Sequence, residues 1–222
     1  MASVMPIEKD SRPLFPRIAV LISGRGSNLQ SIIDAIAAGE LHATIAIVIS
    51  NRTDAPGLMR AREAGLETVC LSPREYGSRD EYDRAIARYL KARDVDLICL
   101  AGFMRLIGQG LLDAYPNAIL NIHPSLLPAF PGLDAQRQAL EHGVRITGVT
   151  VHLVNSDLDA GPIVLQAAVP VLYDDTVDTL SARILIEEHR IYPKAIALVL
   201  GGDWEISGRR FRLTRRPAAD EI

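Results

Sequence analysis

Residues 121–128, with the sequence Asn-Ile-His-Pro-Ser-Leu-Leu-Pro, hold the two side chains best suited to chemistry. Asn121 and His123 follow an apolar run typical of a strand, and side chains two apart in a strand point to the same side. Pro124 disfavours a helical backbone at His123, so the chain should leave the strand abruptly. An amide donor and an imidazole are thus presented together at a strand end, where open α/β sheets bind ligands. The alternative is an asparagine and a histidine in a proline-rich loop.

A glycine-rich loop, Ser-Gly-Arg-Gly-Ser-Asn-Leu at residues 23–29, separates the first expected strand from the first expected helix. Glycines allow a tight turn, and the exposed amides of a helix N-terminus bind anions. The loop fits neither the dinucleotide fingerprint G-x-G-x-x-G nor the P-loop, which needs Lys followed by Ser or Thr. It therefore indicates a site for a terminal phosphate. The alternative is that Ser27 only caps the helix.

A third candidate is the loop Asn-Ser-Asp-Leu-Asp-Ala-Gly-Pro at residues 155–162. Its composition specifies a turn, so it can be read simply as a hairpin-like connection. Asp157 and Asp159, two apart, could also present one carboxylate to the site. A carboxylate beside an imidazole raises the pKa of the histidine and fixes the orientation of the ring.

The remaining histidines and Ser125 predict no further site. His142 follows a helical stretch, His152 lies in a strand and His189 in the last helix, and none has a metal-binding spacing. No metal site is therefore predicted. Ser125 lies near His123 but lacks the G-x-S-x-G elbow, so the serine-hydrolase interpretation is weak.

The elements that must position these residues alternate between strand and helix in the first half of the chain. Continuous apolar runs predict buried strands, and amphipathic segments with stop signals predict helices. Strands are expected at residues 17–22, 43–50, 67–71, 96–101 and 118–122, and helices at 27–38, 56–64 and 78–91, the last with a capping box at Ser78 and Glu81. This alternation predicts a Rossmann-like, doubly wound, mostly parallel sheet of the α/β class.

After residue 130 the pattern becomes β-rich. A helix is expected at residues 133–142, two strands at 147–154 and 163–171, and a long closing helix at 176–200 that bends at Pro193. Residues 208–222 are expected to form a short strand and a loose tail. We therefore expect one domain at residues 16–202, preceded by a disordered lead-in at 1–15 and followed by a C-terminal extension at 203–222.

Composition excludes several classes of protein. The 222 residues are 48% hydrophobic and 23% charged, as in an ordinary soluble domain, and the net charge of −3 gives no sign of nucleic-acid or anionic-membrane binding. Cys70 and Cys99 lie in apolar strand-like runs and are expected to fill the core. With no signal peptide and no run long enough to span a bilayer, the protein is expected to be cytoplasmic.

Five motifs, taken in order, resemble those of the phosphoribosylglycinamide formyltransferase family of purine biosynthesis. They are the glycine loop, Ala-Gly-Phe-Met-Arg at 101–105, Asn-Ile-His-Pro-Ser-Leu-Leu-Pro at 121–128, Asp-Leu-Asp-Ala-Gly-Pro at 157–162 and Glu-Glu-His at 187–189. The third motif alone is shared by the wider formyltransferase superfamily, and the glycine loop narrows the resemblance to the phosphoribosylglycinamide formyltransferases. The resemblance covers residues 16–202. Ala160 departs from the family, which usually has a second glycine there.

The resemblance implies transfer of a formyl group from the co-substrate 10-formyltetrahydrofolate to the amine of 5'-phosphoribosylglycinamide, without a metal. Asn121, His123 and Asp159 are implied to be catalytic. Asn121 would donate a hydrogen bond to the developing oxyanion. His123 would be the proton donor and electrostatic stabiliser. Asp159 would keep the imidazole protonated and help move the amine proton toward the departing folate nitrogen through water.

The resemblance also implies binding residues. Gly26, Ser27 and Asn28 would bind the ribotide phosphate, and Glu188 would contact the ribotide. The implied folate site consists of Arg79, Met104, Arg105, Leu106, Ile107, Asn121, Asn155, Ser156, Asp157, Leu158 and Asp159. Without the resemblance, Met104 and Leu106 would be assigned to the core, and Arg79 to the solvated surface of a helix.

Three rival functions remain. Formyltetrahydrofolate deformylase has the same Asn, His and Asp set but normally carries an N-terminal regulatory domain, and only about fifteen residues precede the first expected strand here. Methionyl-tRNA formyltransferase needs a C-terminal RNA-binding domain that residues 203–222 cannot form. A non-catalytic nucleotide- or folate-binding module would not need the catalytic set. The expected partners are small-molecule substrates, with no nucleic acid and no membrane, and the sequence leaves open whether the chain forms a homodimer.

Overall fold

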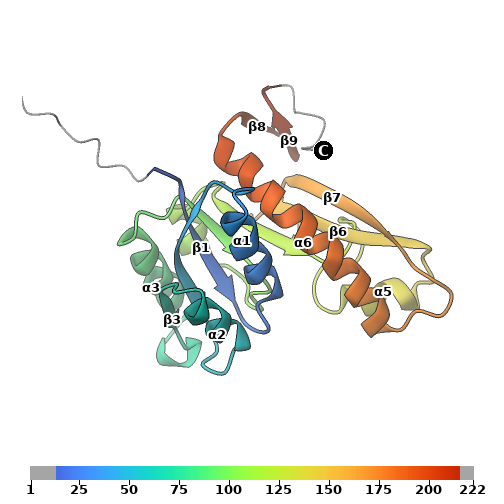
Figure 1. The fold of residues 1–222 in the computed structure, drawn as a ribbon, viewed down its shortest axis with the longest axis horizontal. Coiled ribbons are helices and arrows are strands. Elements are labelled where there is room, and N and C mark those ends of the chain that lie inside the picture. The colour runs from blue at the N-terminus through green and yellow to red at the C-terminus, as the bar shows by residue number, and fades with distance from the viewer. Residues whose placement is uncertain (1–13, 216–222) are drawn as a thin grey trace, which may run out of the picture.

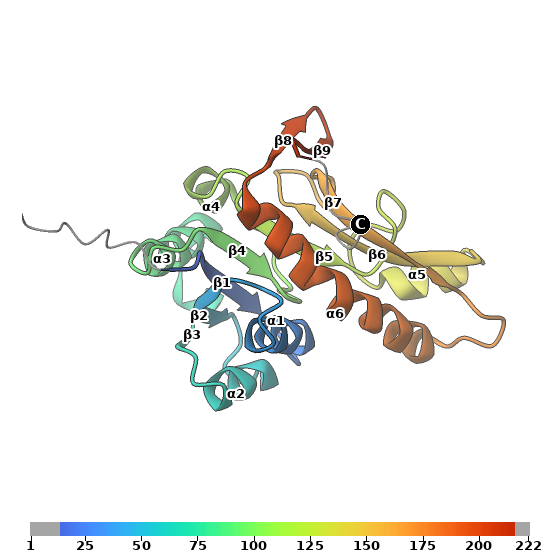
Figure 2. The same ribbon diagram turned by 45° about the horizontal axis from the view of Figure 1, so that its top comes forward.

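The structure, a computed structural model, describes residues 14–215. These residues form one nine-stranded sheet in the order β3-β2-β1-β4-β5-β6-β7-β9-β8, with helices on both faces (Figures 1 and 2). The strands are β1 (Arg17–Ile22), β2 (Thr44–Ser50), β3 (Thr68–Cys70), β4 (Leu97–Leu100), β5 (Ile119–His123), β6 (Ile146–Leu153), β7 (Ile163–Pro170), β8 (Trp204–Ser207) and β9 (Arg210–Leu213). The helices are α1 (Ser27–Ala37), α2 (Pro56–Glu63), α3 (Arg79–Lys91), α4 (Gln109–Ala114), α5 (Ala135–Glu141) and α6 (Val177–Gly201), with a 3₁₀ turn at Pro73–Glu75.

The first five strands are parallel and are buried on both faces where helices cover them. In β1, Ile18, Val20 and Ile22 join the core beneath α1, α2 and α6. The alternate residues Ala19 and Leu21 join the core beneath α3 and α4. Because successive side chains of a strand point to opposite faces, a strand covered on both sides must be apolar throughout. This explains the continuous apolar run at residues 17–22.

Helices cover the β-rich half of the sheet on one face. Strands β5, β6 and β7 pair in antiparallel fashion, and α6 packs along them. Leu120, Ile122, Val149 and Val151 face the core beneath α6. The intervening side chains of these strands therefore point to the other face, and they include Asn121, His123, Thr150 and His152.

The strand order reverses at β1, which lies between β2 and β4. Open α/β sheets bind ligands in the crevice at such a switch point, outside the carboxyl ends of the strands. Here the loops after β1 and β4 are tied together, because the Ser23 backbone N–H donates to the carbonyl of Gly102 at 3.1 Å. The Met104 backbone N–H also donates to Ser23 Oγ at 2.8 Å.

The α/β fold class is confirmed, and so are the strands and helices expected from the sequence, with boundaries shifted by at most two residues. Helix α6 runs through Pro193 as a single 25-residue element. The capping box at α3 is only half formed. Ser78 accepts from the Glu81 backbone N–H, but the Glu81 side chain accepts from Gly77 and not from Ser78.

Three short elements were missed by the sequence analysis. They are the 3₁₀ turn, helix α4, and strand β8, which forms a hairpin with β9 and extends the sheet beyond β7. The lead-in and the tail expected at the two ends lie largely outside the described residues. Cys70 and Cys99 are both free thiols, and Cys99 is buried in β4. None of the helices in residues 14–215 is both long and apolar enough to cross a membrane.

Candidate active site

Asn121 and His123 lie at the carboxyl end of β5, on the face of the sheet that α6 does not cover. The antiparallel register with β6 places Asn121 directly opposite His152, and His123 opposite Thr150. Directly opposed side chains in an antiparallel pair are close enough to interact. The pairing of β5 with β6 therefore gathers two imidazoles and one amide at the end of one strand.

The ring of His123 is held from both sides. Its Nε2 donates to the carbonyl of Phe130 at 2.8 Å, because a carbonyl can only accept. Its Nδ1 lies 3.4 Å from Asp159 Oδ2. Burial lowers the pKa of His123 below its ordinary value, although the Phe130 carbonyl and the Asp159 carboxylate both act to raise it. A lowered pKa favours the neutral ring and makes the protonated ring a stronger acid, which differs from the expectation that Asp159 would keep the imidazole protonated.

Asp159 lies in the loop between β6 and β7, distant in sequence from His123. Its carboxylate has three neighbours: Gly132, His152 and His123. The Gly132 backbone N–H donates to Oδ2 at 2.8 Å, and His152 Nε2 lies 3.6 Å from Oδ1. Burial raises the pKa of Asp159, but the interaction with His152, the hydrogen bond from the Gly132 backbone N–H and the imidazole of His123 outweigh it. The net result is a lowered pKa, so the carboxylate remains ionised at neutral pH.

The backbone around this carboxylate adopts left-handed conformations at residues other than glycine. Phe130, Asp134 and Asp159 have φ values of 55°, 55° and 48°. Such conformations are uncommon for non-glycine residues and persist only where the surrounding structure enforces them. Backbone strain at these positions accompanies the contacts that aim Phe130 O and Asp159 at the His123 ring.

His152 belongs to this group, and the sequence analysis missed it. Its side chain is 2% exposed. Its Nδ1 donates to the carbonyl of Leu153 at 3.0 Å, which leaves Nε2 of the neutral ring to accept from Asn121 Nδ2 at 3.2 Å. One amide N–H of Asn121 is thereby used, and the second can donate to a ligand. We call these four candidates for catalysis, Asn121, His123, His152 and Asp159, the catalytic cluster.

A buried polar network holds the chain immediately after His123. Thr150 Oγ1 donates to the carbonyl of Ser125 at 2.7 Å and accepts from the Leu127 backbone N–H at 3.0 Å. Gln166 Nε2 donates to the same hydroxyl and to the carbonyl of Leu127. Ser125 Oγ donates to the carbonyl of Ala129. The hydroxyl of Ser125 is therefore committed to the loop, which argues against a nucleophilic role.

The glycine loop turns sharply into α1 at Gly26, whose φ is 72°. Gly26 is the N-cap residue, and no side chain caps this helix. Capping by Ser27, the alternative interpretation from the sequence, is therefore wrong. A Cβ on Gly26 would lie 2.7 Å from Gly57 Cα, so this glycine is also required for the packing of α2 against the loop.

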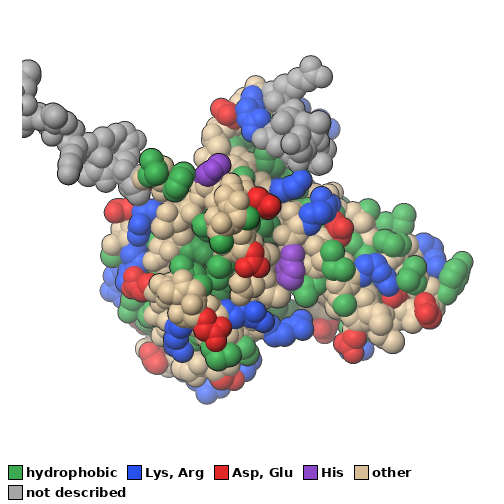
Figure 3. Space-filling view, in the orientation of Figure 1, with side chains coloured by type: hydrophobic (Ala, Val, Ile, Leu, Met, Phe, Trp, Pro, Cys, Tyr) green, Lys and Arg blue, Asp and Glu red, His purple; other side chains and the backbone are tan. Residues whose placement is uncertain are grey.

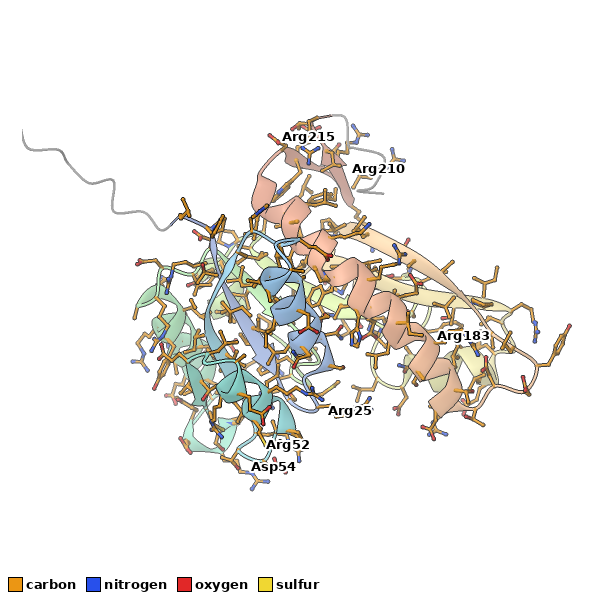
Figure 4. The ribbon with its side chains drawn as sticks, in the orientation of Figure 1. Arg25, Arg52, Asp54, Arg183, Arg210 and Arg215 are labelled. Atoms are coloured by element: carbon orange, nitrogen blue, oxygen red, sulfur yellow. The ribbon has the colours of Figure 1, made fainter. Side chains whose placement is uncertain are left out.

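Asn28 and Glu188 form a buried pair between α1 and α6. Asn28 Nδ2 donates to Glu188 Oε2 at 2.6 Å, while Asn28 Oδ1 is buried without a hydrogen-bond partner among the described residues. Burial raises the pKa of Glu188, against the hydrogen bond from Asn28 and the charge of Arg25. Arg25 lies in the loop that follows β1, on the same side of the molecule as Arg52 and Asp54 (Figure 4). The amide oxygen of Asn28 is therefore an unused acceptor in the part of the chain that the structure describes.

Most of the residues expected to bind folate lie in two separate loops and are exposed, whereas Asn121 lies in β5 and Arg79 in α3. Met104 is 67% exposed and Leu106 54%, so neither is a core residue, in contrast to the assignment made without the resemblance. Arg79, at the start of α3, is exposed, whereas Arg105 and Ile107 are partly buried. In the second loop, residues 155–158 are exposed, and Asn155 Oδ1 accepts from the Asp157 backbone N–H at 3.2 Å.

A separate pocket of about 860 Å³ lies between α1 and α6. Its wall includes Ser27, Gln30, His189 and Lys194 but no residue of the catalytic cluster. Side chains of both charges are scattered over the face that carries α1 and α6 (Figure 3). The pocket therefore reaches the start of α1 at Ser27 but contains none of the candidate catalytic side chains. Within residues 14–215 no group of three or more His, Cys, Asp or Glu side chains is arranged to hold a metal ion.

Comparison with known proteins identifies the family. A model of the formyl transferase family matches residues 16–196, which include β1 to β7 and most of α6. The chain belongs to the formyl transferase family. The crystal structure of glycinamide ribonucleotide transformylase 1 from Symbiobacterium toebii is 56% identical to this formyl transferase, with a TM-score of 0.88. The match covers 92% of this chain and 99% of that one.

Two curated relatives show different lengths. Phosphoribosylglycinamide formyltransferase from Escherichia coli strain K12 is 46% identical over 185 residues, which cover 83% of this formyl transferase and 87% of the relative. The trifunctional purine biosynthetic protein adenosine-3 from Homo sapiens is 50% identical over 186 residues. Those residues cover 84% of this chain but only 18% of the human protein, so this formyl transferase corresponds to a small part of its length.

Proposed function

We propose that this formyl transferase moves the formyl group of 10-formyltetrahydrofolate onto the amine of 5'-phosphoribosylglycinamide in de novo purine biosynthesis. The observation that carries the proposal is the catalytic cluster, in which an amide donor, two imidazoles and an ionised carboxylate lie together at the carboxyl end of β5. The set contains proton carriers and a hydrogen-bond donor but no activated nucleophile. It therefore suits direct attack by a substrate amine.

The ribotide binds on the side of the site that we call the ribotide wall, made of Gly26, Ser27, Asn28 and Glu188. Support comes from the uncapped N-terminus of α1, whose backbone amides suit a phosphate. Asn28 Nδ2 is already bonded to Glu188, so the Asn28 side chain contributes its unpaired Oδ1. That oxygen and the Glu188 carboxylate both accept hydrogen bonds, which suits them to sugar hydroxyls more than to the phosphate.

The formyl donor binds on the side that we call the donor wall, made of residues 104–107 and 155–158. Support comes from the exposed apolar side chains of Met104, Leu106 and Leu158, which a flat aromatic ring would cover. Exposed backbone amides and carbonyls in both loops suit the polar edge of a pterin. Arg105 belongs to this wall and Arg79 lies close to Gly108 at the end of its first loop, so both supply positive charge near an anionic donor.

The reaction begins when the ribotide amine attacks the formyl carbon. A C–N bond forms, and the formyl oxygen becomes an oxyanion that accepts from the second amide N–H of Asn121. The amine then loses a proton toward Asp159, through water. His123, a strong acid when protonated because its pKa is lowered, donates a proton to folate N10 as the bond from N10 to the formyl carbon breaks. His152 keeps Asn121 and Asp159 in place.

The test is the absorbance change of 10-formyltetrahydrofolate with the purified protein, with and without 5'-phosphoribosylglycinamide. We expect the donor to be consumed only when the ribotide is present. Equal consumption without the ribotide would favour a deformylase and would overturn the proposal. No consumption under either condition, with both ligands bound, would favour a binding module.

A further inference from the structure

Asp83 is a buried acid that the proposed reaction does not use. It lies in α3, is 1% exposed and belongs to the face of the helix that packs on the sheet. Its Oδ2 accepts from the Gly108 backbone N–H at 2.7 Å. A carboxylate is seldom buried to this extent unless other groups compensate its charge. One backbone hydrogen bond compensates it only in part.

Two arginines of the proposed donor site compensate it further, although burial still leaves the pKa of Asp83 raised. Arg79 lies one helical turn before Asp83 on α3, and the side-chain stem of Arg79 crosses close to Gly108. Arg105, from the loop after β4, stacks on the ring of Tyr82 at 5.1 Å. Both guanidinium groups act electrostatically on Asp83. Arg105 Nε is buried without a hydrogen-bond partner among the described residues, so its position depends on packing and charge.

The loop between Gly102 and Gly108 is tied at both ends. At its start the Met104 backbone N–H donates to Ser23 Oγ, and at its end the Gly108 backbone N–H donates to Asp83. The exposed side chains of Met104 and Leu106 lie between these two ties. Asp83 is therefore placed to control both the backbone of this loop and the two cations beside it.

We infer that Asp83 is a positioning residue for the formyl donor: it anchors Gly108 and orients Arg79 and Arg105 toward the donor wall. This inference rests on the proposed function of that wall. A purely structural role would be different, since Asp83 would then only start helix α4 at Gly108. The variant Asp83→Asn distinguishes the two roles. Its side chain keeps an acceptor oxygen for the Gly108 backbone N–H but removes the carboxylate charge that faces the arginines.

The experiment compares Asp83→Asn and Asp83→Ala with the parent protein. The matched control is Asp80→Asn, which removes an exposed acid from the same helix. The kcat, the KM for each substrate and the melting temperature are measured for all four proteins. We expect Asp83→Asn to raise the KM for 10-formyltetrahydrofolate about threefold to tenfold, with the ribotide KM and kcat within about twofold of the parent. Asp83→Ala should have a larger effect on the same KM and a lower melting temperature.

The inference is wrong if Asp83→Asn leaves the KM for the donor unchanged, or raises both KM values equally. It is also wrong if Asp80→Asn has the same effect. If Asp83→Ala does not fold, the asparagine variant alone decides. Calorimetric titration of 10-formyltetrahydrofolate into each protein separates this result from the proposed function. A parent that binds the donor but transfers no formyl group contradicts the function, and weaker donor binding by Asp83→Asn would still support the inference.

Discussion

The two proposed walls of the site differ in burial and in chemistry. The ribotide wall is built on a buried hydrogen-bonded pair, Asn28 and Glu188, which joins α1 to α6. The donor wall consists of two loops whose apolar side chains, including Met104, Leu106 and Leu158, are largely exposed. In the catalytic cluster the two imidazoles are also buried, with side-chain exposures of 7% for His123 and 2% for His152.

This difference indicates two ways of selecting a substrate. A buried polar pair rejects a ligand that leaves one of its atoms unpaired, so a single missing hydroxyl has a large effect. An exposed apolar surface gains affinity in proportion to the area that a ligand covers, and it discriminates weakly between similar rings. We therefore expect strict selection of the acceptor and more tolerant selection of the donor.

The largest expected effect comes from the catalytic cluster. His123→Ala and Asp159→Asn should each lower kcat by at least about a hundredfold, because each removes a proton carrier or the charge that supports it. Both KM values should change little, which steady-state kinetics measures. His142→Ala, an exposed histidine outside the cluster, is the control. Folded variants with near-normal turnover would contradict the assignment of the cluster.

The next largest effect is expected at the ribotide wall. Asn28→Ala should raise the KM for the ribotide by about 5- to 150-fold, corresponding to about 1–3 kcal/mol for a lost buried hydrogen-bonding group. The KM for the donor should stay nearly unchanged. Gln30→Ala, on the exposed side of α1, is the control. An equal rise in the KM for both substrates would contradict the assignment of this wall to the ribotide.

Gly26→Val tests the ribotide wall less cleanly than Asn28→Ala, because Gly26 is also needed for packing. A side chain at Gly26 would meet the backbone of Gly57 and would also occupy a left-handed conformation. The variant should therefore lose stability in addition to ribotide affinity. Its melting temperature should fall, whereas a role confined to phosphate binding would leave it unchanged.

A smaller effect is expected at the donor wall. Met104→Ala should raise the KM for 10-formyltetrahydrofolate about fivefold, since it removes part of the apolar area that the ring covers. Met59→Ala, an exposed methionine on α2, serves as the control. A rise in the ribotide KM, with no change for the donor, would reverse the assignment of the two walls.

The smallest expected effect is a pH dependence of stability. Because the pKa of His123 is lowered in the folded protein, the neutral ring is favoured there. Its contribution to stability is complete above the unfolded pKa of about 6.5 and is lost as the pH falls through the folded pKa. The melting temperature of His123→Gln should therefore fall less than that of the parent between pH 7 and pH 5. His189, also shifted downward, is present in both proteins and cancels. Parallel curves would contradict the shift.

Much of the fold could be predicted because its signals are local. The apolar run of β1 and the periodicity of α1 depend on neighbours in the sequence, and both elements were predicted within a residue or so. The expected hydrogen bond from the Ser78 backbone N–H to the Glu81 side chain does not form, because the Glu81 carboxylate accepts from the Gly77 backbone N–H instead. Strand β8 is too short, and too dependent on pairing with β9, to give a signal of its own.

Site residues could be predicted from the sequence only where they lie within a recognisable motif. The resemblance assigned Asn121, His123 and Asp159, and the structure brings these three together. His152 had no motif, and only the register of β5 and β6 places it opposite Asn121. Its signal was a polar side chain in an otherwise apolar strand. The partnership of Asn28 with Glu188 joins residues 160 positions apart, so no local pattern could predict that the Asn28 amide is already in use.

The most direct test of the account follows the formyl carbon itself. 10-Formyltetrahydrofolate labelled with ¹³C in the formyl group is mixed with the protein and 5'-phosphoribosylglycinamide, and the products are read by NMR and mass spectrometry. The account predicts that the label appears on the ribotide amine, in equal amount to the tetrahydrofolate formed, and that His123→Ala abolishes the transfer. Labelled formate in place of labelled ribotide would contradict it.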